Sequence, residues 1–65
     1  MIAHVGDRLV VEGVRLGVPR RVGVIIGVRH PDGAPPYDVK WLDTGRESVV
    51  FPGAEAHVET ASTSR

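Results

Sequence analysis

Cysteine is absent from this 65-residue chain, so neither disulfides nor a thiolate metal site can hold it together. No stretch approaches the roughly 20 consecutive apolar residues that a membrane-spanning helix needs. The N-terminus carries Asp7 and Arg8 before an apolar run could reach the length of a signal peptide, so no export signal is expected. These absences together predict a cytoplasmic protein that does not associate with membranes.

Net charge is also lacking, because eight basic and eight acidic side chains cancel. A domain whose whole surface is built for nucleic acid is expected to be basic, so that class is disfavoured. The halves do differ: five basic and two acidic residues precede Pro31, whereas three basic and six acidic residues lie from Pro31 onward. Such an asymmetry indicates either a charged partner or an ordinary mixed surface.

The length allows one small domain. A chain this short buries only about 60% of the surface that its unfolded form exposes, so its stability is expected to be modest. The 42% content of hydrophobic residues is enough for a compact β fold. We expect a single domain over residues 1–60 and a disordered polar tail over residues 61–65.

The clearest secondary-structure pattern lies between Arg20 and Leu42. Two alternating apolar runs flank a turn rich in proline and glycine, which favours two half-buried antiparallel strands joined as a hairpin. The residues predicted to face the core are Val22, Val24, Ile26 and Val28, then Tyr37, Val39 and Trp41. The opposite side of the first run, predicted to face outward, carries Arg21, Gly23, Ile25, Gly27 and Arg29.

Turn signals between short apolar segments divide the rest of the chain. The predicted strands cover residues 8–12, 20–29, 37–42, 46–51 and 57–60, with one helical turn over Ala54–Ala56. Short strands at this spacing are typical of an all-β sandwich or barrel, and 65 residues are too few for a sandwich. The sequence therefore predicts an all-β fold, a small five-stranded antiparallel SH3-like barrel with one short helical turn before the last strand.

A family resemblance supports this fold. The residues that carry it are Val5-Gly6-Asp7, Leu9, Val11, Gly13, Ile26, Val28, Asp32-Gly33, Pro35-Pro36-Tyr37, Val39, Trp41, Gly45, Glu47, Val50 and Pro52-Gly53. Their order resembles a family of short actinobacterial proteins that is known only as a domain of unknown function with an SH3-like barrel. The resemblance extends from Val5 to Val58, and its most specific part is the run Asp-Gly-x-Pro-Pro-Tyr-x-Val-x-Trp. It implies the fold and transfers no catalytic or binding residue.

No residue pattern predicts catalysis or a cofactor. A nucleophile needs an oriented base beside it, and Ser48, the serine nearest the middle of the chain, falls within a predicted strand. The three histidines, His4, His30 and His57, lack the short spacings of metal-binding motifs. We therefore expect no enzyme activity, no cofactor and no metal.

Surface recognition is the remaining class. Arginine forks suit phosphate and carboxylate groups, exposed aromatic rings can stack on bases, and an exposed apolar side chain can dock against a protein. Trp41 shares a face with Val39, which favours a core position for its ring, whereas the face of Phe51 stays open. The candidate partner-binding residues are Arg20, Arg21, Ile25, Arg29, Lys40 and Phe51.

Two functions are compatible with these residues. The first is a non-catalytic protein-interaction module that docks a protein or peptide on an open edge or apolar patch. The second, ranked lower because the net charge is zero, is a weak nucleic-acid binder that uses the arginine-rich strand. A monomer or a weak homodimer formed through a strand edge fits either function.

Overall fold

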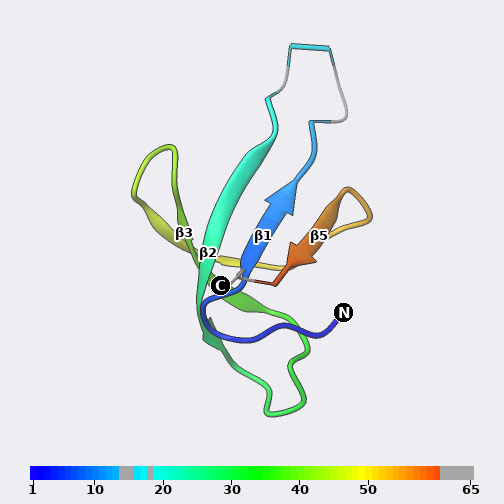
Figure 1. Cartoon of the computed structure of the whole chain (residues 1–65), viewed down its shortest axis with the longest axis vertical. Coiled ribbons are helices and arrows are strands. Elements are labelled where there is room, and N and C mark those ends of the chain that lie inside the picture. The colour runs from blue at the N-terminus through cyan, green and yellow to red at the C-terminus, as the bar shows by residue number, and fades with distance from the viewer. Residues whose placement is uncertain (14–15, 18, 61–65) are drawn as a thin grey trace.

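The fold is one antiparallel β-sheet. The computed structural model describes residues 1–13, 16–17 and 19–60. Its strands are β1 (Arg8–Val11), β2 (Arg21–Val28), β3 (Tyr37–Trp41), β4 (Glu47–Val50) and β5 (Ala56–Glu59). Their order is β4-β3-β2-β1-β5, so that β1 lies between β2 and β5 (Figure 1). The predicted all-β class and the five antiparallel strands are confirmed, whereas the predicted tail over residues 61–65 lies outside the described residues.

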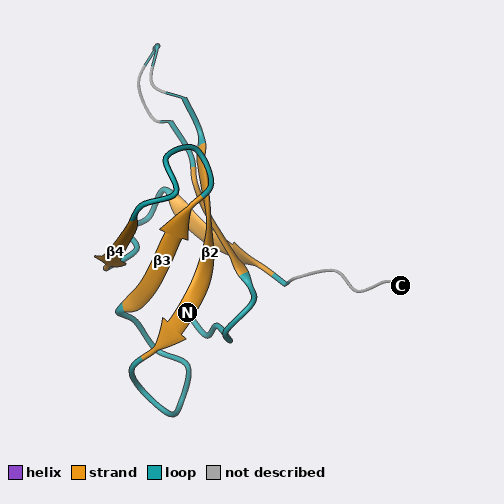
Figure 2. Cartoon of the chain, turned by 90° about the vertical axis from the view of Figure 1, so that its left-hand side faces the viewer, coloured by secondary structure: helices purple, strands orange, loops and turns teal. Residues whose placement is uncertain are grey.

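The sheet is unclosed, and the predicted barrel is therefore not confirmed. β4 and β5 are the two edges of the sheet, and β4 lies at the side of β3 beyond which no further described strand follows (Figure 2). The helical turn predicted over Ala54–Ala56 is wrong. A single bond from the Ala56 N–H to the Gly53 carbonyl, at 3.1 Å, closes a turn, and β5 begins at Ala56 itself. Two residues between Gly53 and Ala56 are too few for even one turn of 3.6 residues.

The core lies on one side of the sheet, which we call the inner face. Its fully or nearly buried members are Ala3, Leu9, Ile25, Tyr37, Val39 and Trp41. Val50 from β4 and Val58 from β5 pack against this cluster, so both edge strands contribute to one core. The predicted inward positions in the second half of the hairpin are thereby confirmed.

A β-bulge in β2 changes which residues reach the core. The register shifts between Ile25 and Gly27, so Ile26 has no partner across the ladder to β3. Before the bulge Ile25 lies opposite Val39, and after it Val28 lies opposite Tyr37. Both therefore point to the inner face, because one extra residue reverses the alternation of a strand.

The predicted orientation of the first half of the hairpin is consequently wrong. Ile25, which the alternation placed outside, is fully buried, whereas Ile26, which it placed inside, is 41% exposed. Val24 lies opposite Lys40, on the side of the sheet that we call the outer face. Val22, two residues earlier in the strand, lies on the same outer face. Only the part of the pattern after the bulge has the predicted phase.

Gly23 also lies on the inner face rather than outside. It is opposite Trp41, and a Cβ at this position would overlap the Val39 side chain and come within 3.1 Å of Trp41 Cε3. Glycine here lets the indole ring lie close against the β2 backbone.

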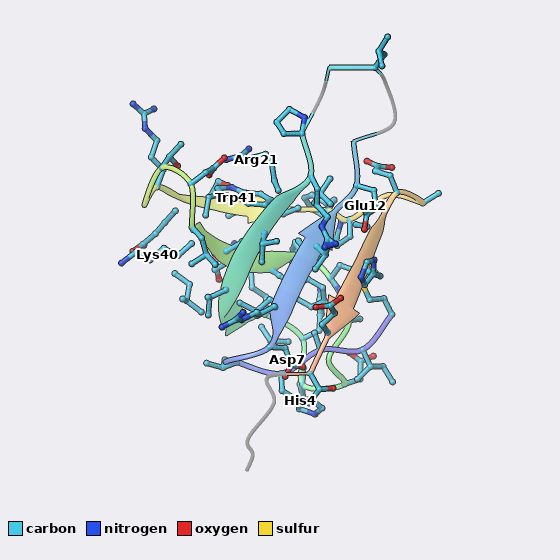
Figure 3. The ribbon with its side chains drawn as sticks, turned by 45° about the horizontal axis from the view of Figure 1, so that its top comes forward. His4, Asp7, Glu12, Arg21, Lys40 and Trp41 are labelled. Carbon is cyan, nitrogen blue, oxygen red and sulfur yellow. The ribbon has the colours of Figure 1, made fainter. Side chains whose placement is uncertain are left out.

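The segment before β1 closes one end of the core. The Ala3 N–H donates to the Gly33 carbonyl at 3.0 Å, and the Tyr37 hydroxyl donates to the same oxygen at 2.7 Å. Asp7, which is buried, accepts a bond from the His4 N–H at 3.0 Å, and the two residues lie together in Figure 3. No helix among the described residues is long and apolar enough to cross a bilayer.

Candidate functional site

Arg29, one of the predicted binding residues, is engaged within the protein. Its Nε and Nη2 donate to the two carboxylate oxygens of Asp38 at 3.3 and 2.9 Å. The hydrogen bonds from Arg29 lower the pKa of Asp38, and those to Asp38 raise the pKa of Arg29. A paired guanidinium of this kind has less charge to offer to an external phosphate.

Arg21 is engaged in a second ion pair, on the inner face. Its guanidinium lies 4.1 Å from the centroid of the Trp41 ring, and its Nε and Nη2 donate to Asp43 at 3.0 and 3.1 Å. Hydrogen bonding from Arg21 lowers the pKa of the Asp43 carboxyl. Figure 3 shows Arg21 beside Trp41, on a different element from Lys40. Arg21 therefore has two roles: its side chain covers the edge of the core, and its guanidinium contributes charge to the surface.

The basic residues do not form one patch. Arg20 has its Nη1 3.9 Å from Glu12, and Lys40 lies on the outer face between Val24 and Glu47 in the register. Arg21 is on the other face. The four basic residues of the hairpin thus divide between two faces, and each of the three arginines has a carboxylate partner.

Two of the three aromatic side chains belong to the core. Tyr37 is fully buried, and Trp41 is 8% exposed, with its Nε1 donating to Ser48 Oγ at 2.8 Å. The predicted core position of Trp41 is confirmed, so its ring offers no open face for a base. Phe51, by contrast, is 76% exposed directly after β4.

Exposed apolar side chains gather where β4 borders the outer face. Ile26 at the bulge and Val49 on β4, which is 47% exposed, line a shallow hollow of about 350 Å³. The remaining lining residues are Asp38, Glu47 and Ser48. We call Ile26, Val49 and Phe51 the β4 margin.

Sequence reasoning identified only Phe51 of these three. Val49 could have been found, because it alternates with Val50, whose inward position follows from its place opposite Tyr37. Ile26 could not, since nothing in the alternation of β2 marks the extra residue. Ile25, which was predicted as a binding residue, is unavailable to any partner because the core encloses it.

Two of the three histidines, His4 and His30, line the same hollow, whereas His57 lies on β5. His4 has its Nδ1 3.7 Å from Asp7, and His57 lies 3.9 Å from Glu12 and 3.2 Å from Glu59. The hollow that His4 and His30 share has a volume of about 260 Å³ and lies between the N-terminal segment and the turn that follows β2. Within the part of the chain that the structure describes, no three metal-binding side chains come together.

Known proteins similar to this chain are themselves uncharacterized. A family model described as a domain of unknown function (DUF1918) matches residues 1–58. The uncharacterized protein Rv0569 of Mycobacterium tuberculosis is 49% identical over 61 residues, which cover 94% of this chain and 69% of that protein. The uncharacterized protein Mb2324 of Mycobacterium bovis is 48% identical over 62 residues, which cover 95% and 78%. The solution structure of the conserved hypothetical protein Rv2302 from M. tuberculosis is similar with a TM-score of 0.64 and 48% identity, over 94% of this chain and 76% of that one.

Proposed function

Because the chain belongs to the DUF1918 family, a domain of unknown function, we propose its role from its geometry: a small non-catalytic protein-interaction module. The observation that supports this proposal is the β4 margin. Val49 and Phe51 are exposed at β4, whose outer side has no partner strand among the described residues, and Ile26 lines a hollow together with Val49. Exposed apolar groups of this kind, next to an open edge, are typical of surfaces that dock a protein.

The sheet is best understood as a variant of the SH3-like barrel. The strand order brings β5 back beside β1, and both edge strands place a valine, Val50 and Val58, against one shared core. A sheet that curls over a single core in this way is a rigid scaffold of a size that suits binding.

A non-catalytic role fits the state of the titratable groups. The resolved pKa shifts of Arg29, Asp38 and Asp43 each have a hydrogen-bonded salt-bridge partner as their first cause, and the pKa of Tyr37 is raised by burial. These are the shifts of structural pairs rather than of an acid and a base poised in a cleft. That the protein works in the cytoplasm and needs no cofactor stays part of the same proposal.

The nucleic-acid alternative ranks below protein binding. Phosphate contacts require cations that can exchange their counterions for phosphate oxygens. Arg20, Arg21 and Arg29 already lie beside Glu12, Asp43 and Asp38 respectively.

The proposal is tested by comparing what three immobilised forms of the protein retain from a native lysate. Val49→Asp places a charge in the β4 margin, and Leu42→Asp makes the same change at another exposed apolar residue, beyond the end of β3. A partner that binds at the β4 margin is retained by the wild type and Leu42→Asp but not by Val49→Asp. The same set of retained proteins for all three forms would exclude this surface.

A further inference from the structure

The backbone of β4 presents hydrogen-bonding groups to solvent at alternate residues. The Trp41 N–H donates to the Arg46 carbonyl at 2.8 Å, which makes Trp41 and Arg46 a hydrogen-bonded pair. Because such pairs alternate with non-bonded ones in an antiparallel ladder, Ser48 and Val50 also point their backbone groups at β3. Glu47 and Val49 therefore direct their N–H and C=O groups away from the sheet, and the alternation continues to Phe51.

This edge is short and carries one charged side chain, Glu47, but it lacks the other usual devices against strand pairing. Such devices include lysine or proline on the edge, bulges and inward charges. Residues 47–51 contain neither lysine nor proline. By the same alternation, the backbone N of Pro52 faces the β3 side, so its missing N–H does not interrupt the open side. The other edge, β5, carries His57 and Glu59, whose Nε2 and Oε2 lie 3.2 Å apart along one face of the strand.

The edge is complementary to itself in one register. We propose that the partner of the β4 margin is a second copy of this chain, whose β4 pairs antiparallel with the first about a twofold axis at Val49. This inference rests on the proposed function and names its partner. Val49 then lies opposite Val49 of the other copy, and Glu47 lies opposite Phe51, so that every outward-directed group in residues 47–51 is bonded. Each N–H donates to a carbonyl of the facing strand.

Neighbouring registers are less favourable. Moving the axis to Glu47 brings two carboxylates directly opposite each other, which destabilises a strand pair. Moving it to Ser48 leaves the backbone groups of Phe51 outside the ladder. Moving it to Val50 brings Gly53 opposite Glu47, beyond Pro52, where the chain has already left the sheet. The axis at Val49 alone uses the full exposed length.

Self-association of this kind covers two of the three residues that define the margin, Val49 and Phe51. Diagonal neighbours in an antiparallel pair are near enough for an aromatic side chain to reach, so Phe51 of each copy contacts Val49 of the other. Two copies of zero net charge have no overall repulsion to overcome. A five-residue edge is much smaller than the interface of a stable dimer, so the dimer is weak and forms at high concentration.

Single-cysteine variants test the register directly, because the chain has no cysteine of its own. In the proposed dimer the two Val49 Cα atoms are about 5.5 Å apart, which is within reach of a disulfide. The two Glu47 Cα atoms are about 14 Å apart, four residues along the strands, and cannot be bridged. Val49→Cys is therefore expected to form a disulfide dimer at least about tenfold faster than Glu47→Cys under mild oxidation, a ratio that corresponds to about 1.4 kcal/mol.

The outcomes separate the two proposals. Preferential cross-linking of Val49→Cys, slowed by adding Phe51→Glu, supports the dimer, as does a sedimentation weight that rises with concentration for the wild type but not for Val49→Asp. Equal rates for the two cysteine variants, or a faster rate for Glu47→Cys, overturn it. If the dimer is overturned while a lysate protein still depends on Val49, the proposed function stands with another partner. If neither dependence is seen, both proposals fall.

Discussion

Replacing Tyr37 by phenylalanine measures how firmly the turn that follows β2 is tied to the core. The substitution removes only the hydroxyl, which donates to the Gly33 carbonyl at 2.7 Å inside the protein. That carbonyl keeps its second bond, from the Ala3 N–H at 3.0 Å, so no acceptor is left wholly without a partner. The cost is therefore that of one net hydrogen bond, about 1 kcal/mol of unfolding free energy. For a domain of this size it corresponds to a fall of about 4–8 °C in Tm.

The same hydroxyl predicts a pH dependence. Burial raises the pKa of Tyr37 above its ordinary value, and the charge of Asp32 acts in the same direction. The native state thus favours the neutral phenol. Stability from this group is complete below the pKa of the unfolded chain, about 10, and is lost as the pH rises from there through the raised native value. Tyr37→Phe lacks the phenol, so the difference in Tm between the two proteins is expected to shrink above that pH.

Thermal unfolding followed by circular dichroism, from neutral to alkaline pH, checks both expectations. Tyr37 is the only tyrosine, so the absorbance of the tyrosinate reports its ionisation without interference. A variant with the Tm of the wild type at neutral pH would show that the hydroxyl is not bonded as described. If Tyr37→Phe lost as much stability at alkaline pH as the wild type does, another group would be responsible for that loss.

Three further substitutions test the packing and the ion pairs. Ile25→Asp is expected to abolish the native near-ultraviolet circular dichroism, because it buries an unpaired carboxylate, whereas Ile26→Asp, one residue on, leaves the spectrum native; the reverse result would place the bulge elsewhere. Gly23→Val is expected to lower the unfolding free energy in urea by about 1–3 kcal/mol through overpacking, and an unchanged midpoint would contradict the close approach of the indole. Because Arg29 lowers the pKa of Asp38, that pair contributes stability above the ordinary carboxyl value of about 3.9 and loses it as the pH falls through the lowered one. Arg29→Gln should therefore reduce the loss of stability at acid pH, measured in low salt. If that loss were unchanged, the pair would not contribute to stability.

Period-two alternation predicted the strands but not which side of β2 is buried. The pattern over β3 was sufficient, because Tyr37, Val39 and Trp41 alternate without interruption. In β2 both faces consist of apolar residues and glycine apart from Arg21, so the sequence allows either face to be the buried one. Because of the bulge at Ile26, the buried residue before it is Ile25 and the inward residue after it is Val28. A bulge leaves no mark on the amino-acid composition of a strand. Its position is determined by how β2 packs against Val39 and Tyr37 on the neighbouring strand.

The candidate site depended even more on tertiary register. The basic residues were visible in the sequence, but their partners were not, because Arg21 and Asp43 are 22 residues apart and meet only through the pairing of β2 with β3. Arg29 and Asp38 meet across the same ladder. A surface that looks basic along one strand is thus neutralised by the neighbouring one.

This neutralisation decides which physical force is left for association. With Arg20, Arg21 and Arg29 paired internally, less counterion release is available, so binding driven by charge would be weak at this surface. The open backbone groups of Glu47 and Val49 and the exposed side chain of Phe51 remain unused. Burial of apolar surface and strand pairing respond little to moderate salt, whereas phosphate binding falls steeply with it. Association through the β4 margin should therefore persist as salt is added, and that persistence separates it from any residual affinity for nucleic acid.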